Sequence, residues 1–201
     1  MERSVRIGVF VACLLPFFWI LYTAISGSLG PDPAKTLMLF TGEWSLRMLA
    51  LTLIVSPAYA STGWLLLMKL RRMFGLFAFF YGCVHFFSFA QFYVGWDVSA
   101  LAKELVERPY ITLGFCAWVL MLPLAVTSTR AMQRRLRRNW QRLHRLVYPA
   151  AIAACLHLLW QVRSDIGEAL FYLVVFCFLL GWRVRRRLER NRRTVAAKAS
   201  A

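Results

Sequence analysis

The sequence predicts an all-α integral membrane protein, a bundle of six transmembrane helices, and three observations lead to this fold class. First, 60% of the 201 residues are hydrophobic and the mean hydropathy is +0.55, well above the values of water-soluble domains. Second, the apolar residues form stretches long enough to cross about 30 Å of hydrocarbon as helices that rise about 1.5 Å per residue. Third, basic residues gather in alternate connecting segments, as the positive-inside rule requires. A water-soluble globular protein is therefore excluded.

The six predicted spans follow one another with short connections. They cover residues 7–25, 46–68, 73–94, 110–127, 146–162 and 169–184. The first follows two arginines, as in a secretory signal, but its apolar run exceeds the roughly 7 to 15 residues of a signal core, so we expect it to remain as a span. The connections are rich in Gly, Pro and charged residues, and none is long enough for a second domain. We expect a single transmembrane domain over residues 1–201, without internal repeats.

The formal charge of +16 is explained mostly by topology. With a cytoplasmic N-terminus, the inner segments hold 20 of the 25 Lys and Arg residues, while seven of the nine acidic residues lie outside. This distribution predicts that both termini are cytoplasmic. In a soluble protein such a charge would suggest a nucleic-acid partner, but here we expect none. The basic segment 130–140 predicts a short interfacial helix that binds anionic membrane lipid.

Histidines carry the candidate chemistry, because acidic residues are absent from the middle of every predicted span. His85 follows the inner basic residue Arg72, and His157 follows Arg145, by nearly the same length of chain. Both imidazoles therefore lie about 18 to 20 Å from the inner face, on different helices. Such a pair can supply both axial ligands of a haem iron, and Gly82 would allow close approach of the macrocycle. Buried histidines with ordinary hydrogen bonds, another metal or a proton-transfer role remain alternatives.

A second candidate site lies at the predicted inner interface. His144, Arg71 and Arg72 could bound a second cofactor or a quinone, since planar guanidinium groups bind phosphate or carboxylate groups in a bidentate manner. On an ideal helix, His144 and His157 point about 140° apart, although Pro149 between them could bend the helix. The alternatives are that His144 contacts lipid phosphate and that the arginine pair is only a topology signal.

Several short segments, taken in order, resemble a known family. They are Thr41–Trp44, Arg71–Leu76, Tyr81–His85, Arg108–Gly114, Leu122–Ser128 and Leu143–Tyr148. Together they resemble the MsrQ (YedZ) family, the haem-binding membrane subunits of the bacterial periplasmic methionine sulfoxide reductase system, within the ferric reductase-like transmembrane group. The similarity runs from about Thr41 to Arg183, so it implies a single ferric reductase-like transmembrane domain.

This resemblance implies a function in electron transfer. The protein would be a multi-pass protein of the bacterial inner membrane that binds b-type haem and FMN. It would pass electrons from the quinone pool, or from a cytoplasmic flavin reductase, to a periplasmic molybdopterin-containing catalytic subunit (MsrP-like) in a heterodimer. That catalytic subunit would reduce methionine sulfoxide in proteins.

The resemblance also assigns site residues. The family's haem-binding histidines correspond to His85, His157 and His144, and its arginine pair corresponds to Arg71 and Arg72. In the wider group the third span often carries a second histidine, at the position that Arg72 occupies in this sequence. The arginine there favours FMN or a quinone beside Arg71, Arg72 and His144 over a second bis-histidine haem.

Two other functions remain open at this stage. One is a metal-reducing membrane cytochrome, which the missing flavin and nicotinamide domain disfavours. The other is a non-redox membrane scaffold whose histidines are structural. Since the chain has no catalytic triad or dinucleotide fold, we expect an electron-transfer subunit whose substrate chemistry takes place on another polypeptide.

Overall fold

The computed structural model describes residues 2–161 and 166–199, with side chains described as far as residue 192, and its regular structure is helical throughout these ranges. Six stretches there are long and apolar enough to cross a membrane, which confirms the predicted fold class. They comprise α1 (Glu2–Ile25), α2 (Pro33–Thr62), α3 (Leu65–Phe89) with the π-helical turn η1 (Ala90–Val94), α5 (Pro109–Val126), α8 (Val147–Gln161) and α9 (Ile166–Ala199). The shorter elements are α4 (Val98–Glu107), α6 (Arg130–Leu136), α7 (Arg138–Leu143) and the 3-10 turn η2 (His144–Leu146), of which α7 and η2 extend the fifth spanning stretch.

The second predicted span, 46–68, is wrong at both ends. The Asp32 carboxylate accepts a hydrogen bond from the backbone N–H of Lys35 at 3.0 Å and caps α2, and proline follows at the first helical position. The helix ends at Gly63, whose φ of 67° is the left-handed conformation common at helix C-termini. The predicted start was too late because the first part of α2 contains polar residues, which interrupt the apolar stretch. The basic residues 69–72 had suggested a loop, although long basic side chains extend to the interface from within a helix.

The other predicted boundaries agree with the helices to different degrees. The ends at residues 25 and 94 coincide with helix ends and α5 is shifted by a single residue, but α3 begins at Leu65 instead of residue 73 and α9 continues well past residue 184. The predicted end of the fifth span, Val162, lies outside the described residues, as do Arg163 and Asp165 of the outer connection. The interfacial helix predicted over 130–140 is divided into α6 and α7 at Arg137, whose φ is 47°. Helix α4 was not predicted.

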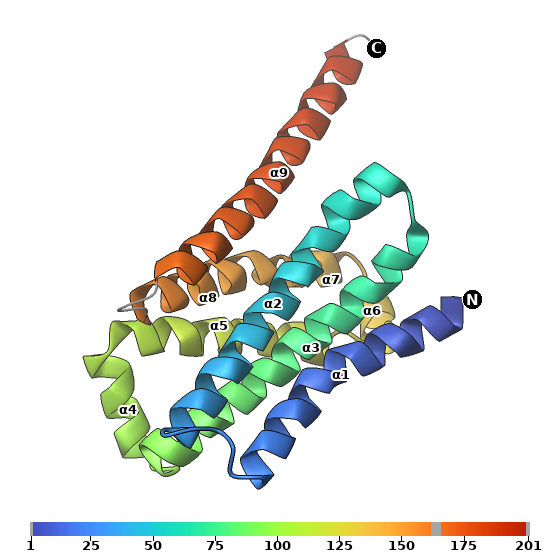
Figure 1. Ribbon diagram of the computed structural model, residues 1–201. Coiled ribbons are helices and arrows are strands. Elements are labelled where there is room, and N and C mark those ends of the chain that lie inside the picture. The colour runs from blue at the N-terminus through green and yellow to red at the C-terminus, as the bar shows by residue number, and fades with distance from the viewer. Residues whose placement is uncertain (1, 162–165, 200–201) are drawn as a thin grey trace.

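The helices pack as two principal pairs, α2 with α3 and α5 with α8, while α1 and α9 pack on the outside of these pairs. In Figure 1 both termini, the α2–α3 turn and α6 lie toward one end of the bundle, and α4 and the α1–α2 connection lie toward the other. The basic segments of the chain therefore gather at one end, as the alternation of charge in the sequence predicts.

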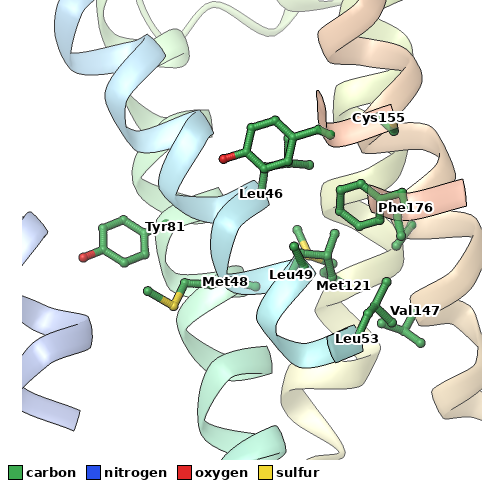
Figure 2. Close-up of a cluster of buried hydrophobic side chains, with 14 of the residues drawn as sticks. Leu46, Met48, Leu49, Leu53, Tyr81, Met121, Val147, Cys155 and Phe176 are labelled. Carbon is green, nitrogen blue, oxygen red and sulfur yellow. The ribbon is translucent and has the colours of Figure 1, made fainter. Parts of the chain in front are cut away.

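The core lies between α2 and its neighbours. Figure 2 shows Leu46, Leu49 and Leu53 of α2 among side chains from α5, α8 and α9, including Met121, Val147, Cys155 and Phe176. Fully buried alanines at positions 78, 150 and 151 let these helices approach closely. Because lipid tails are as apolar as this core, close packing and interhelical hydrogen bonds hold the bundle together, rather than exclusion from water.

One such hydrogen bond replaces a backbone hydrogen bond that α2 lacks at Pro57. Pro57 has no N–H, so the carbonyl of Leu53 loses its donor within the helix. The Arg183 side chain of α9 replaces this donor, with Nη2 2.7 Å from the Leu53 oxygen and 3.2 Å from the hydroxyl of Ser56. The same guanidinium lies 5.6 Å above the ring of Tyr148. An unpaired carbonyl is costly in a membrane, so the hydrogen bond from Arg183 stabilises the packing of α9 on α2 near Pro57.

Candidate functional site

The structure brings together the two histidines that the sequence places at one depth. His85 of α3 and His157 of α8 are neighbours, with their ring centroids 6.2 Å apart and their planes at 74°. Both rings are half-buried within the bundle. The prediction that the two imidazoles lie at the same level on different helices is therefore confirmed.

Each imidazole is oriented by a backbone carbonyl of a neighbouring helix. Nδ1 of His85 lies 2.8 Å from the carbonyl oxygen of Met38 in α2, and Nδ1 of His157 lies 2.6 Å from that of Tyr110 in α5. Since a carbonyl oxygen can only accept, Nδ1 of each ring carries the proton and donates it. In the neutral ring the lone pair then belongs to Nε2. Histidines that bind metals are usually oriented in this way.

A glycine lies against each ring. A Cβ atom on Gly42 of α2 would lie 3.0 Å from Nδ1 and Cε1 of His85, and one on Gly114 of α5 would lie 2.9 Å from the same atoms of His157. Atoms this close to a Cβ would force the ring or the helix to move. Both positions therefore require glycine if the imidazoles are to keep their places.

These contacts form an internal repeat. Each set comprises a carbonyl that accepts from the imidazole, a glycine beside the ring and the histidine itself, and the sets are Met38, Gly42, His85 and Tyr110, Gly114, His157. The spacing between positions 38 and 110 is the same as that between 42 and 114 and that between 85 and 157. The cysteines at positions 83 and 155 have this spacing too. The expectation of no internal repeats is wrong for these helices. A comparison of the sequence with itself at this offset could have identified the glycines.

The pair fits a haem better than a bare metal ion. A metal bound by two imidazoles at about 2 Å from each nitrogen separates the ring centroids by about 6 Å, close to the 6.2 Å between His85 and His157. Among the described residues there is no group of three or more His, Cys, Asp or Glu side chains that could hold a metal ion. A macrocycle brings four ligands of its own, so two histidines suffice.

Aromatic side chains of α3 and α5 stack on one another. Phe86, next to His85 in the sequence, stacks on Trp118 with ring centroids 4.5 Å apart, and Trp118 also stacks on Phe79. The indole N–H of Trp118 donates to the sulfur of Cys83 at 3.4 Å. Gly82 has a different role from the one expected, because a Cβ there would meet side chains of α2 and α5 at 3.2–3.6 Å. That glycine permits helix packing rather than the approach of a macrocycle.

His144 lies apart from this pair, in η2 before the start of α8. Its ring stacks on Trp140 with centroids 3.9 Å apart, and its Nδ1 lies 3.1 Å from the Trp140 carbonyl oxygen. The angle expected for an ideal helix does not apply, because η2 interrupts the helix at His144. Pro149 belongs to the first turn of α8, where proline is tolerated.

The two arginines of the predicted pair differ in their surroundings. Arg71 is half-buried and lies within electrostatic range of both His144 and Arg183, whereas Arg72 is exposed. The sequence interpretation missed Arg183, which it counted among the inner basic residues although the predicted last span, 169–184, includes it. Its signal was indirect, since Pro57 leaves a carbonyl that needs an external donor.

An acidic residue, Glu43, occurs inside α2, contrary to the expectation that acidic residues are absent from the middle of the spans. Arg47 forms an ion pair with Glu43 at 2.9 Å, lies 3.7 Å from Glu168 of α9, and donates through Nε to the hydroxyl of Tyr172 at 3.2 Å. These charges had been assigned to outer loops because the start of α2 was misplaced. Since the guanidinium and the carboxylates neutralise one another, this cluster connects α2 to α9.

Comparison with known proteins supports this interpretation of the helices. Residues 41–155 match the family model described as "Ferric reductase like transmembrane component". This interval contains Gly42, His85, Gly114 and His144, and it ends just before His157. No solved structure matches the chain.

Curated relatives cover almost the entire chain. A protein of Xanthomonas campestris pv. campestris (strain 8004) is 42% identical over 202 residues, which span 98% of this chain and 93% of the relative. One of Polaromonas naphthalenivorans (strain CJ2) is 40% identical over 195 residues, with 96% and 89% of the two chains covered. Both bear the name "Protein-methionine-sulfoxide reductase heme-binding subunit MsrQ".

Proposed function

Because the chain belongs to the MsrQ family, within the ferric reductase-like transmembrane group, we propose that it is a b-type haem subunit that carries electrons across the membrane. The observation that carries this proposal is the matched pair His85 and His157, each with Nδ1 hydrogen-bonded to a carbonyl and Nε2 left as the metal-binding nitrogen. Haem iron held by two imidazoles supplies one-electron chemistry, because it alternates between the ferric and ferrous states.

The protein's own groups set the geometry of this site. The carbonyls of Met38 and Tyr110 fix the protonation and rotation of the two rings, and Gly42 and Gly114 leave the space in which the rings lie. Imidazoles fixed in this way would hold the iron through the same two nitrogens in either oxidation state.

Electrons would enter at the opposite end and leave near the histidines. In this proposal FMN or a quinone occupies the inner site beside Arg71, Arg72 and His144 and receives electrons from the quinone pool or a cytoplasmic flavin reductase. The acceptor is a periplasmic molybdopterin-containing catalytic subunit that forms a heterodimer with this chain and repairs oxidised methionine in proteins. The names of the relatives support a reductase partner.

This direction of transfer requires both termini to be cytoplasmic, in the bacterial inner membrane. The concentration of basic segments at one end of the bundle supports that orientation. A reporter that is active only in the cytoplasm should be active when fused after Ala201, and a reporter that is active only in the periplasm should be inactive there. Activity in the periplasm alone would reject the orientation.

Spectroscopy of the purified full-length protein tests the function itself. We expect a Soret band, and α and β bands that appear on reduction and disappear when the oxidised catalytic subunit is added. A protein without these bands would be a scaffold with structural histidines. A protein whose haem is oxidised by ferric chelates but not by the catalytic subunit would be a metal-reducing cytochrome.

A further inference from the structure

Three basic side chains from separate elements converge at the inner end of the bundle. Arg71 comes from α3, Arg183 from α9 and His144 from η2. Arg71 is within electrostatic range of the other two, and the Arg183 guanidinium lies over the ring of Tyr148 in α8. Four elements therefore surround one positively charged region at the membrane boundary.

No carboxylate neutralises this region within the described part of the chain. The hydrogen bonds described for Arg183 go to neutral oxygens, those of Leu53, Ser56 and Leu179. Of the inner acidic residues, Glu2 pairs with Lys69 at 2.5 Å and Glu189 pairs with Arg185 at 2.9 Å. Arginines held near each other without a counter-charge are unfavourable, and an anionic ligand would remove that repulsion.

The chemistry of the ligand follows from the groups that face it. Guanidinium groups bind the oxygens of phosphate with several directional hydrogen bonds, and the half-buried position strengthens each of them. The stacked rings of Trp140 and His144 add a flat surface beside the charges. The exposed Arg72 is adjacent in the sequence but lacks these neighbours.

We propose that Arg71 and Arg183, with His144 beside them, form a binding site for the phosphate group of an organic phosphate, and that Arg72 lies outside it. The proposal deepens the proposed function, on which it rests, by adding Arg183 to the inner site and removing Arg72. The phosphate could belong to FMN or to an anionic phospholipid, and the experiment separates these two sources.

The first arm compares FMN with riboflavin, which differs from FMN only by its missing phosphate. Haem-loaded protein in phosphatidylcholine nanodiscs is titrated with each flavin and the quenching of flavin fluorescence is followed. Wild type should bind FMN about 10- to 100-fold more tightly than riboflavin, the range expected for hydrogen bonds to a charged group. Arg71→Gln and Arg183→Gln should abolish this preference, while the matched control Arg72→Gln should keep it.

The second arm tests phospholipid. In nanodiscs that contain phosphatidylglycerol, the lipid that remains with the protein after delipidation is measured by mass spectrometry. If wild type shows no preference for FMN yet retains phosphatidylglycerol, and Arg71→Gln and Arg183→Gln lose it while Arg72→Gln retains it, the site is supported with lipid as its ligand. If neither flavin preference nor lipid retention changes in Arg71→Gln, the proposal is wrong. It is equally wrong if Arg72→Gln has as large an effect as Arg71→Gln.

Controls separate this site from folding and from the proposed function. Arg183 also donates to the Leu53 carbonyl, so its loss could affect folding. Arg183→Lys keeps the positive charge but lacks the planar guanidinium group that binds phosphate in a bidentate manner. Weakened phosphate selectivity with a normal haem spectrum in this variant supports the site. Should both Arg183 variants fail to fold, Arg71→Gln decides the question, because no such structural bond is described for Arg71. Loss of the haem spectrum would count against the proposed function, whereas loss of phosphate selectivity alone concerns only the inner site.

Discussion

The helix pairs α2–α3 and α5–α8 are alike at one end and different at the other. Toward the outer end each pair presents a carbonyl, a glycine and a histidine at corresponding positions, and the two histidines meet. Toward the end that we propose is inner, the interval of the repeat aligns Arg72 of α3 with His144 of η2, the turn that precedes α8. One of these side chains is exposed, and the other stacks on Trp140.

This difference indicates that the two ends serve different ligands. A symmetric metal site needs two equal donors, which the repeat supplies only at the outer end. At the inner end the repeat is broken by the exposed Arg72, while the half-buried Arg71 lies within electrostatic range of Arg183 of α9, which belongs to neither pair. A repeat that is kept at one end and lost at the other is consistent with the proposed haem site and anion site within one bundle.

The largest effect should follow from removing either member of the histidine pair. His85→Ala and His157→Ala should each lower haem affinity by more than about tenfold, because even residues that only orient a metal ligand change affinity by about 10–100-fold. Haem content per inserted protein, measured from the reduced spectrum, checks this. The two variants should behave alike, since their surroundings match.

His144→Ala is the control for this prediction. Its ring contacts Trp140 rather than the histidine pair, so haem content should stay at the wild-type level. If His144→Ala lost haem while His85→Ala kept it, the assignment of the two ends would be reversed.

Adding one methyl group beside each histidine should have the next largest effect. Gly42→Ala and Gly114→Ala place a Cβ at 3.0 and 2.9 Å from an imidazole, and such overpacking costs about 1–3 kcal/mol. We expect an altered low-spin spectrum and a lower thermal midpoint, with the larger change for Gly114→Ala. Gly181→Ala is the matched control, because a Cβ there meets nothing within 4 Å. An equal shift in all three variants would mean that the effect is general to helix glycines.

The helices and the histidine pair could be predicted from sequence for a simple reason. Hydrocarbon imposes long apolar stretches, and a fixed rise per residue converts the positions of His85 and His157 into depth. Contacts between residues far apart in the chain could not be obtained in this way. The interaction of Arg183 with the Leu53 carbonyl depends on how α9 packs on α2, and the different exposure of Arg71 and Arg72 depends on the rotation of α3.

An effect of similar size is expected where Arg183 of α9 donates to the Leu53 carbonyl of α2. Arg183→Met should lower the free energy of unfolding by about 1–3 kcal/mol, because it leaves the Leu53 carbonyl unpaired. Pro57→Ala restores the helical N–H for that carbonyl, so Arg183→Met should cost less in the Pro57→Ala background. The coupling free energy between the two positions is obtained by unfolding wild type, the two single variants and the double variant in denaturing detergent. Strictly additive losses would show that Arg183 does not compensate for the proline.

The smallest effect should come from a substitution that makes the inner ends of the two helix pairs alike in sequence. Arg72→His restores the repeat in sequence, because it places a histidine before His85 at the same interval that separates His144 from His157. Two donors at matching positions are not enough for a second haem, since both must also face one another. The side chain at position 72 is exposed on α3, and the His144 ring is held against Trp140 by stacking and by its Nδ1 bond to the Trp140 carbonyl. The haem-to-protein ratio of Arg72→His should therefore equal that of wild type when both are purified with excess haem. A ratio that doubled, with a second reducible component in a redox titration, would mean that the inner end differs from the outer end only by this one side chain.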